Sequence, residues 1–133
     1  MSKTKDWFMK TQYNEQIGAD KMITQRPWGY FVVLEDKDTH KVKRIVVHGG
    51  QRLSYQSHDK RAETWVFTEG EGIVTIDEVE QKVVPKSVMN IPLKAKHRIK
   101  NTGESDLVFI EVQTGEYFGE DDIVRYNDDY GRA

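Results

Sequence analysis

The most informative part of the chain is the stretch GQRLSYQSHDKRAETWVFTEG, residues 50–70, which begins and ends with glycine. Within it, Gln56 and His58 are two residues apart, and Glu63 follows five residues later. Residues two apart on a β-strand project to the same face of a sheet, so an amide oxygen and an imidazole would enter one space. A carboxylate that follows after a short bend could join them. The stretch therefore predicts three ligands of a metal site, to be completed by a histidine from elsewhere in the chain.

The size and composition of the chain restrict its class and its partners. Its 133 residues suit one domain. The net charge is −2, with basic and acidic residues interspersed, which gives no electrostatic footprint for binding nucleic acid. No apolar run is long enough to span a membrane and residues 1–10 lack the apolar core of a signal peptide, so we expect a cytoplasmic protein without membrane contact. Zero cysteines exclude disulfides and thiolate zinc sites.

From residue 26 onward the sequence predicts short β-strands separated by turn signals. Their close spacing leaves no room for long crossovers, so the sheets should be antiparallel and form a jelly roll that encloses a pocket. We therefore expect an all-β domain at 26–133, with a short N-terminal arm at 1–25 that lies against the domain or a partner subunit. The tail, 116–133, should fold back over one end. The predicted strands are 29–34, 42–47, 52–56, 63–69, 73–76, 81–84, 87–91, 97–101 and 107–113.

Two stretches have the residue spacing of the cupin superfamily motifs. The first is 50–70 and the second is 92–101, which supplies His97. This resemblance implies a double-stranded β-helix, the cupin jelly roll. Lys86 and Lys94 stand where the second motif commonly has glycine. The expected metal ligands are then Gln56, His58, Glu63 and His97.

A closer resemblance covers residues 26–132. It is carried by the blocks RPWG at 26–29, KVKRIVV at 41–47, RLSYQSHDKRAETW at 52–65, IP at 91–92, HRIKN at 97–101, IEVQTG at 110–115 and GEDDIVRYNDDYGR at 119–132. In this order the blocks are similar to the type II mannose-6-phosphate isomerase domain, which is often the C-terminal half of a bifunctional enzyme with mannose-1-phosphate guanylyltransferase. The chain departs from that family at Asp59, Lys60 and Thr64, where histidine is usual.

The expected ligand set mixes nitrogen and oxygen donors, which suits a borderline divalent ion. We expect zinc, with manganese, iron, cobalt or nickel as alternatives. Protein ligands that leave one position open for water are typical of a catalytic metal site. The alternative for His58 and His97 is an ordinary hydrogen-bonded role without metal.

Isomerisation of a sugar phosphate proceeds through an enediol and needs cations near the developing charge and the phosphate. Arg61 lies two residues before Glu63, so it shares the same face if the strand begins that early. We expect Arg61 to contact the substrate and stabilise the enediolate, a role that the family resemblance also implies. Lys43 is the second candidate, with an exposed surface position as its alternative.

Four further side chains are placed by strand alternation. Trp65 and Phe67 alternate with Glu63 and are expected to pack inside the barrel. Glu111 and Gln113 alternate with apolar residues and are expected to face solvent, with a polar barrel lumen as the alternative.

Three functions follow from these residues. The first is a metal-dependent aldose–ketose isomerase that converts a hexose 6-phosphate, with mannose 6-phosphate and fructose 6-phosphate as the expected pair. The second is a non-catalytic sugar-phosphate-binding or regulatory module, suggested by Asp59, Lys60 and Thr64. The third is an iron-dependent oxygenase, because two histidines and one carboxylate form its ligand set. Exposed sheet faces and the apolar arm also predict a homodimer.

Overall fold

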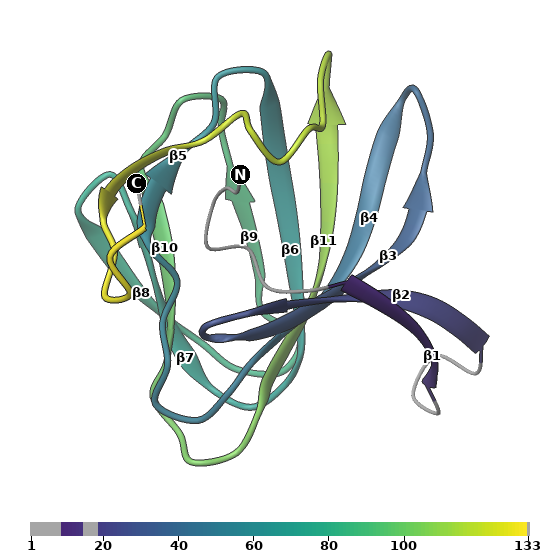
Figure 1. Cartoon of the computed structure of the whole chain (residues 1–133). Coiled ribbons are helices and arrows are strands. Elements are labelled where there is room, and N and C mark those ends of the chain that lie inside the picture. The colour runs from purple at the N-terminus through teal and green to yellow at the C-terminus, as the bar shows by residue number, and fades with distance from the viewer. Residues whose placement is uncertain (1–8, 15–18, 133) are drawn as a thin grey trace.

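The computed structural model describes residues 9–14 and 19–132, and the side chains of 23–132. Every regular element in these residues is a β-strand, and two antiparallel sheets face each other around a barrel (Figure 1). The described residues hold no helix of the length and hydrophobicity that crossing a bilayer requires. The expectation of an all-β fold is confirmed.

Within the described residues, one sheet has seven strands in the order β1-β2-β3-β4-β11-β6-β9, and the other has five in the order β12-β5-β10-β7-β8. The strands are β1 (Met9–Asn14), β2 (Ala19–Arg26), β3 (Gly29–Asp36), β4 (His40–Val47), β5 (Tyr55–Ser57), β6 (Arg61–Glu69), β7 (Gly72–Ile76), β8 (Val79–Val83), β9 (Val88–Ile91), β10 (His97–Asn101), β11 (Leu107–Gly115) and β12 (Val124–Asn127).

All nine predicted strands are present, and three further strands flank them. Several boundaries shift by about two residues, and the largest shift is at the strand predicted at 52–56, which is reduced to β5, while Arg52 makes only an isolated bridge to Lys100. The arm contributes β1 and β2, which pair with each other, while β2 also pairs with β3. The large sheet therefore continues across residues 25 and 26 (Figure 1).

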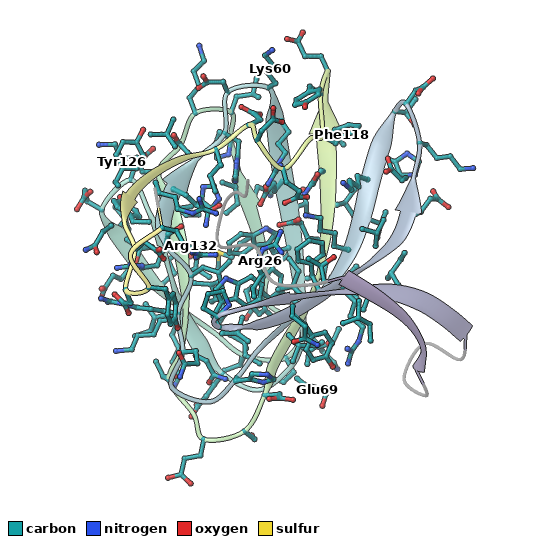
Figure 2. The ribbon with its side chains drawn as sticks, in the orientation of Figure 1. Arg26, Lys60, Glu69, Phe118, Tyr126 and Arg132 are labelled. Atoms are coloured by element: carbon teal, nitrogen blue, oxygen red, sulfur yellow. The ribbon has the colours of Figure 1, made fainter. Side chains whose placement is uncertain are left out.

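The large sheet positions the candidate site through its register across β4, β11 and β6. Side chains on its inner face form rows that become more polar toward the end of the barrel at the top of Figures 1 and 2. Glu69, at the other end of β6, marks the opposite end in Figure 2. In order along the strands, the rows are Ile45–Phe109–Phe67, Lys43–Glu111–Trp65 and Lys41–Gln113–Glu63, followed by Gly115 opposite Arg61.

The apolar row belongs to the main hydrophobic core between the two sheets. Phe67 and Phe109 are fully buried, and their ring centroids lie 4.9 Å apart. Trp65 packs on this pair from the next row, with its centroid 4.8 Å from that of Phe109. The expectation that Trp65 and Phe67 pack inside the barrel is confirmed. Burial of such large rings is the main favourable term holding the two sheets together.

The C-terminal tail crosses the polar end of the barrel, as predicted (Figure 1). We call residues 116–123, between β11 and β12, the crossing segment. The carboxylate of Asp122 accepts hydrogen bonds from the backbone N–H groups of Asp59 and Lys60, at 3.0 and 2.9 Å. After the crossing segment the chain pairs with β5 through β12. The polar end is therefore covered by a segment that is bound to the loop before β6.

Turns at the ends of strands explain the positions of several glycines and of two lysines. Gly70 has φ +82°, and a Cβ there would lie 2.6 Å from the carbonyl oxygen of Asp106. Lys86 and Lys94 also have left-handed backbones, with φ of 81° and 67°. These are the two positions where the cupin motif commonly has glycine. A residue with a Cβ pays about 1 kcal/mol for this conformation, so both lysines are strained.

We expect Lys86→Gly and Lys94→Gly each to stabilise the protein by about 1 kcal/mol, because glycine adopts positive φ without steric cost. Urea unfolding followed by tryptophan fluorescence measures the change. Lys82→Gly is the matched control: Lys82 is also exposed but lies within β8, where glycine should destabilise. Equal destabilisation by all three substitutions would contradict the prediction.

Candidate metal centre

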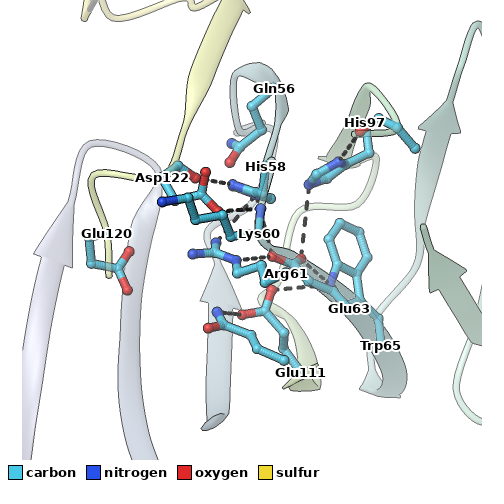
Figure 3. Close-up of polar contacts among 12 residues, drawn as sticks. Gln56, His58, Lys60, Arg61, Glu63, Trp65, His97, Glu111, Glu120 and Asp122 are labelled. Atoms are coloured by element: carbon cyan, nitrogen blue, oxygen red, sulfur yellow. Dashed lines mark hydrogen bonds and ion pairs between the residues drawn. The ribbon is translucent and has the colours of Figure 1, made fainter. Parts of the chain in front are cut away.

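Three side chains that sequence spacing singled out converge at the polar end of the barrel: His58, Glu63 and His97 (Figure 3). The Nε2 atom of His58 lies 3.3 Å from Oε2 of Glu63, and that of His97 lies 3.9 Å from Oε1. Their candidate ligand atoms all lie within 4.8 Å of one another, and each residue is 3% exposed. Glu63 comes from the large sheet and His97 from the small one, so the site bridges the two sheets.

Backbone carbonyls hold both imidazoles in the orientation that a metal ligand needs. Nδ1 of His58 lies 2.7 Å from the carbonyl oxygen of Asp122, and Nδ1 of His97 lies 3.0 Å from that of Ala95. A carbonyl can only accept, so Nδ1 carries a proton in both rings, and Nε2 is the atom that faces Glu63 and is available as a ligand. Burial lowers the pKa of His58 to about 4, which keeps this ring neutral at physiological pH. The donor set therefore fits the expected divalent ion.

Gln56 lines the same cavity from β5, and the register pairs it directly with His97. Its Nε2 donates to Oγ of Ser54 at 2.9 Å and also to the carbonyl oxygen of that residue at 3.3 Å. The amide oxygen is the atom that remains for a ligand role. The structure thus brings the four expected ligand residues to one cavity.

A second buried carboxyl group, Glu111, lies beside Glu63. Trp65 Nε1–H is shared between Oε1 of Glu63 at 2.9 Å and Oε1 of Glu111 at 3.1 Å. Gln113 Nε2 donates to Oε2 of Glu111 at 2.7 Å. Burial and the neighbouring charge of Glu63 raise the pKa of Glu111 to about 8. Burial alone would also raise the pKa of Glu63, but Arg61 and the two histidines outweigh it and lower that pKa below its usual range.

The expectation that Glu111 and Gln113 face solvent is wrong, since they are 4% and 0% exposed. Both lie in the inner rows of the large sheet. The predicted alternation along β11 is present, but the face that carries Glu111 and Gln113 is the inner face of the sheet rather than the outer one. At this end of the barrel the interior is polar, so the usual rule that apolar residues point inward does not apply.

The two expected substrate-contacting cations both point into the cavity. Arg61 shares the face of Glu63 as predicted, and its Nε donates to Oε2 of Glu63 at 2.8 Å. Nη2 lies 3.3 Å from Nε2 of His58, and Nη1 is buried without a hydrogen-bond partner. Lys43 is 3% exposed, so the alternative of a surface position is wrong. Its Nζ lies 2.5 Å from Oε2 of Glu120 and 4.0 Å from the ring centroid of Phe31.

Sequence reasoning missed Glu120 and Asp122 as parts of the site. Both lie in the crossing segment, about fifty residues after the end of the first motif. The only signal was their place in the block GEDDIVRYNDDYGR, within the tail that is predicted to fold back over one end. The tail also has an internal ion pair, because the guanidinium of Arg132 donates to Asp128 at 3.0 and 3.1 Å.

Because Glu111 retains a proton in the folded protein, the stability of the protein should depend on pH. Its pKa is about 8 in the folded protein against an ordinary 4.5, so its stabilising contribution is fully present below pH 4.5 and is lost as pH rises through 8. His58 has the opposite effect, but only below its ordinary pKa of 6.5. Between pH 6.5 and 8 we expect the free energy of unfolding to fall by up to about 1.4 kcal/mol per pH unit.

Glu111→Gln should flatten this slope, because glutamine does not titrate. Urea unfolding at half-unit pH steps in the presence of a chelator measures it. Glu104→Gln, at an exposed position in the turn before β11, is the charge-matched control and should keep the wild-type slope. Identical slopes for wild type and Glu111→Gln would show that Glu111 is ionised in the folded protein.

The chain matches a known family and known proteins over most of its length. Residues 13–128 match the family described as mannose-6-phosphate isomerase C-terminal. The chain is 45% identical over 108 residues to the xanthan biosynthesis protein XanB of Xanthomonas campestris pv. campestris, covering 81% of the chain and 23% of that protein. It is 44% identical over 126 residues to a mannose-1-phosphate guanylyltransferase of Escherichia coli (strain K12), covering 90% and 26%. The chain thus spans about a quarter of the length of these relatives.

Solved structures with a similar fold are more distant in sequence. The capsular polysaccharide assembling protein CapF of Staphylococcus aureus superposes with a TM-score of 0.72 at 20% identity, covering 82% of this chain and 35% of that one. A cupin-2 domain protein of Rhodospirillum rubrum superposes with a TM-score of 0.61 at 19% identity, covering 70% and 67%. These likenesses show the cupin jelly roll that the motifs predicted. The chain has the cupin jelly-roll fold and belongs to the mannose-6-phosphate isomerase C-terminal family.

Proposed function

We propose that this domain is a metal-dependent aldose–ketose isomerase that acts on a hexose 6-phosphate, with mannose 6-phosphate and fructose 6-phosphate as the pair. The observation that carries the proposal is one cavity that contains a buried His–Glu–His cluster, a hydrogen-bonded carboxyl group and two cations. Membership of the family supports the sugar-phosphate class. The cavity supports the chemistry, because these groups can bind an ion, move a proton and hold an anion.

The metal ligands in this proposal are Gln56, His58, Glu63 and His97, and zinc is the expected ion, with manganese, iron, cobalt or nickel as alternatives. When bound, a divalent ion supplies Lewis-acid polarisation of the sugar carbonyl and lowers the cost of the negative charge on an enediolate. Burial lowers the pKa of His58 and keeps that imidazole neutral, and Arg61 keeps the carboxylate of Glu63 charged despite its burial; these are the protonation states that metal binding requires of the two groups.

Glu111 is the proposed group that moves the proton between the two carbon atoms. Among the described residues that line the cavity, the other carboxylates are already ion-paired, Glu63 with Arg61 and Glu120 with Lys43. Glu111 has hydrogen bonds from Trp65 and Gln113 instead, which fix its position without engaging it in an ion pair. A general acid–base group has to be held in this way, within reach of the substrate and free to gain and lose a proton.

Arg61 and Lys43 are the proposed substrate-contacting cations. Arg61 is anchored to Glu63 through Nε, so its two terminal nitrogens project from fixed positions. Nη2, which lies beside Nε2 of His58, can donate to the oxygen of an enediolate that forms next to the metal ligands. Lys43 lies two rows deeper, directly opposite Glu111. The two cations therefore flank the proposed proton-transfer group.

The residues that differ from the usual family pattern lie away from these groups. Asp59 and Lys60 have exposed side chains, and their backbone N–H groups bind Asp122. The hydroxyl of Thr64 donates to Asn90 at 3.0 Å, on the face of β6 opposite to Glu63. These side chains do not line the cavity. The differences therefore favour an enzyme over a non-catalytic sugar-phosphate-binding module.

We expect turnover of mannose 6-phosphate, in a coupled assay with a panel of hexose and pentose phosphates, when a divalent metal is added and not when a chelator is added. Metal analysis should give one bound ion per chain. Glu63→Gln and His97→Asn should each weaken metal binding by more than the roughly 10- to 100-fold that loss of a ligand's hydrogen-bond partner causes, and should lower turnover accordingly. His48→Asn is the matched control, because this exposed histidine pairs with Asp106 outside the cavity.

Three results would reject the isomerase. Absence of turnover on every hexose 6-phosphate at full metal occupancy would do so directly. Tight binding of a sugar phosphate without turnover, at full metal occupancy, would establish the non-catalytic binding module instead. Oxygen consumption by the iron-loaded protein would establish the oxygenase, which would use His58, Glu63 and His97 as its ligands.

A further inference from the structure

One ion pair in the cavity belongs neither to the metal ligands nor to the proposed proton-transfer group. Glu120, in the crossing segment, places its carboxylate 2.5 Å from Nζ of Lys43 and 3.6 Å from Nζ of Lys41. Lys43 is 3% exposed, whereas 39% of the Glu120 side chain is exposed. The cation is therefore part of the barrel interior, and its anionic partner reaches it from the covering segment.

The positively charged surroundings of Glu120 extend beyond the two lysines. Arg61 and Lys43 line the same cavity as Glu120, and Figure 3 shows the Arg61 guanidinium between Glu63 and Glu120. Burial raises the pKa of Glu120, but Lys43, Arg61 and Lys41 outweigh burial and lower it to about 2. Three cations thus act on one carboxylate, so the position that it occupies strongly favours an anion.

The carboxylate of Glu120 does not provide a hydrogen-bond acceptor for every N–H donor of these cations. Nη1 of Arg61 is buried and has no hydrogen-bond partner, although Arg61 is only 6% exposed. A buried guanidinium nitrogen without an acceptor is costly, and a ligand that supplies an acceptor recovers that cost. A phosphate group has more charge than a carboxylate and three acceptor oxygens, so it can contact several cations at once.

We propose that Lys43, Lys41 and Arg61 form a phosphate-binding subsite, and that Glu120 is its internal occupant, which a phosphate group displaces. The crossing segment allows this exchange, because Asp122 binds the backbone of Asp59 and Lys60 independently of Glu120. Glu120 can thus leave while the segment stays attached. That the phosphate belongs to a hexose 6-phosphate rests on the proposed function; that the subsite takes phosphate does not.

The subsite is tested with inorganic phosphate as the probe, by isothermal titration calorimetry of the full chain at low ionic strength, where charge interactions are least screened. Glu120→Gln retains the size of the side chain and removes its charge. We expect it to bind phosphate about tenfold more tightly than wild type, because the internal competitor is gone. Lys43→Met should weaken binding by a similar factor. Titrations with and without added zinc identify phosphate bound to the metal by its dependence on zinc.

Glu116→Gln is the matched control, since it removes one negative charge from an exposed position of the same segment and should leave phosphate affinity within about twofold of wild type. Affinity that is unchanged or weaker in Glu120→Gln would overturn the proposal. Equal affinity in Lys43→Met and wild type, with both folded by circular dichroism, would place the phosphate elsewhere and would also overturn it. Isomerase turnover is measured separately: its absence rejects the isomerase and leaves a positive phosphate result standing.

Discussion

The negative charge of Glu63 in the barrel interior is the constraint on which the site depends. A carboxylate that is 3% exposed is tolerated only when charges and hydrogen bonds compensate for the lost water. Arg61, His58 and His97 face it, and the indole of Trp65 donates to it. The same charge obliges its neighbour Glu111 to keep a proton, because two carboxylates this close cannot both ionise cheaply. One buried charge thus sets the protonation of the whole cluster.

The sheet register explains how these groups reach one another without a long loop. Glu63, Arg61 and Trp65 alternate along β6, so they share its inner face. β11 then places Glu111 opposite Trp65 and brings Lys43 into the same row from the other side. Phe67 and Phe109 pack one row below, where an apolar core supports the polar end. Rigid strands therefore hold the reactive groups, and only the crossing segment contributes from irregular backbone.

The local sequence pattern was sufficient to predict the features that depend on residues close together in the chain. Alternation and turn residues located the nine barrel strands, and motif spacing linked His97 to Glu63 across more than thirty residues. Lys86 and Lys94 were noticed as departures from glycine, and both have positive φ. The predictions that failed concern features set by pairing between strands that are distant in the sequence. Whether Glu111 points inward is decided by the partners of β11, and β2 (Ala19–Arg26) becomes a strand because the edge of β3 is available for pairing.

The hydrogen bond from His58 to the carbonyl of Asp122 has a consequence for how the domain is made. Chains emerge from the ribosome from the N-terminus, and the first three expected ligands have been synthesised by residue 63, long before residue 122. Until that residue is available, the acceptor that fixes the tautomer of His58 is missing. β12, which pairs with β5 beside the site, follows later still. The metal centre can therefore be completed only after the crossing segment has been synthesised, although its first three expected ligands are made much earlier.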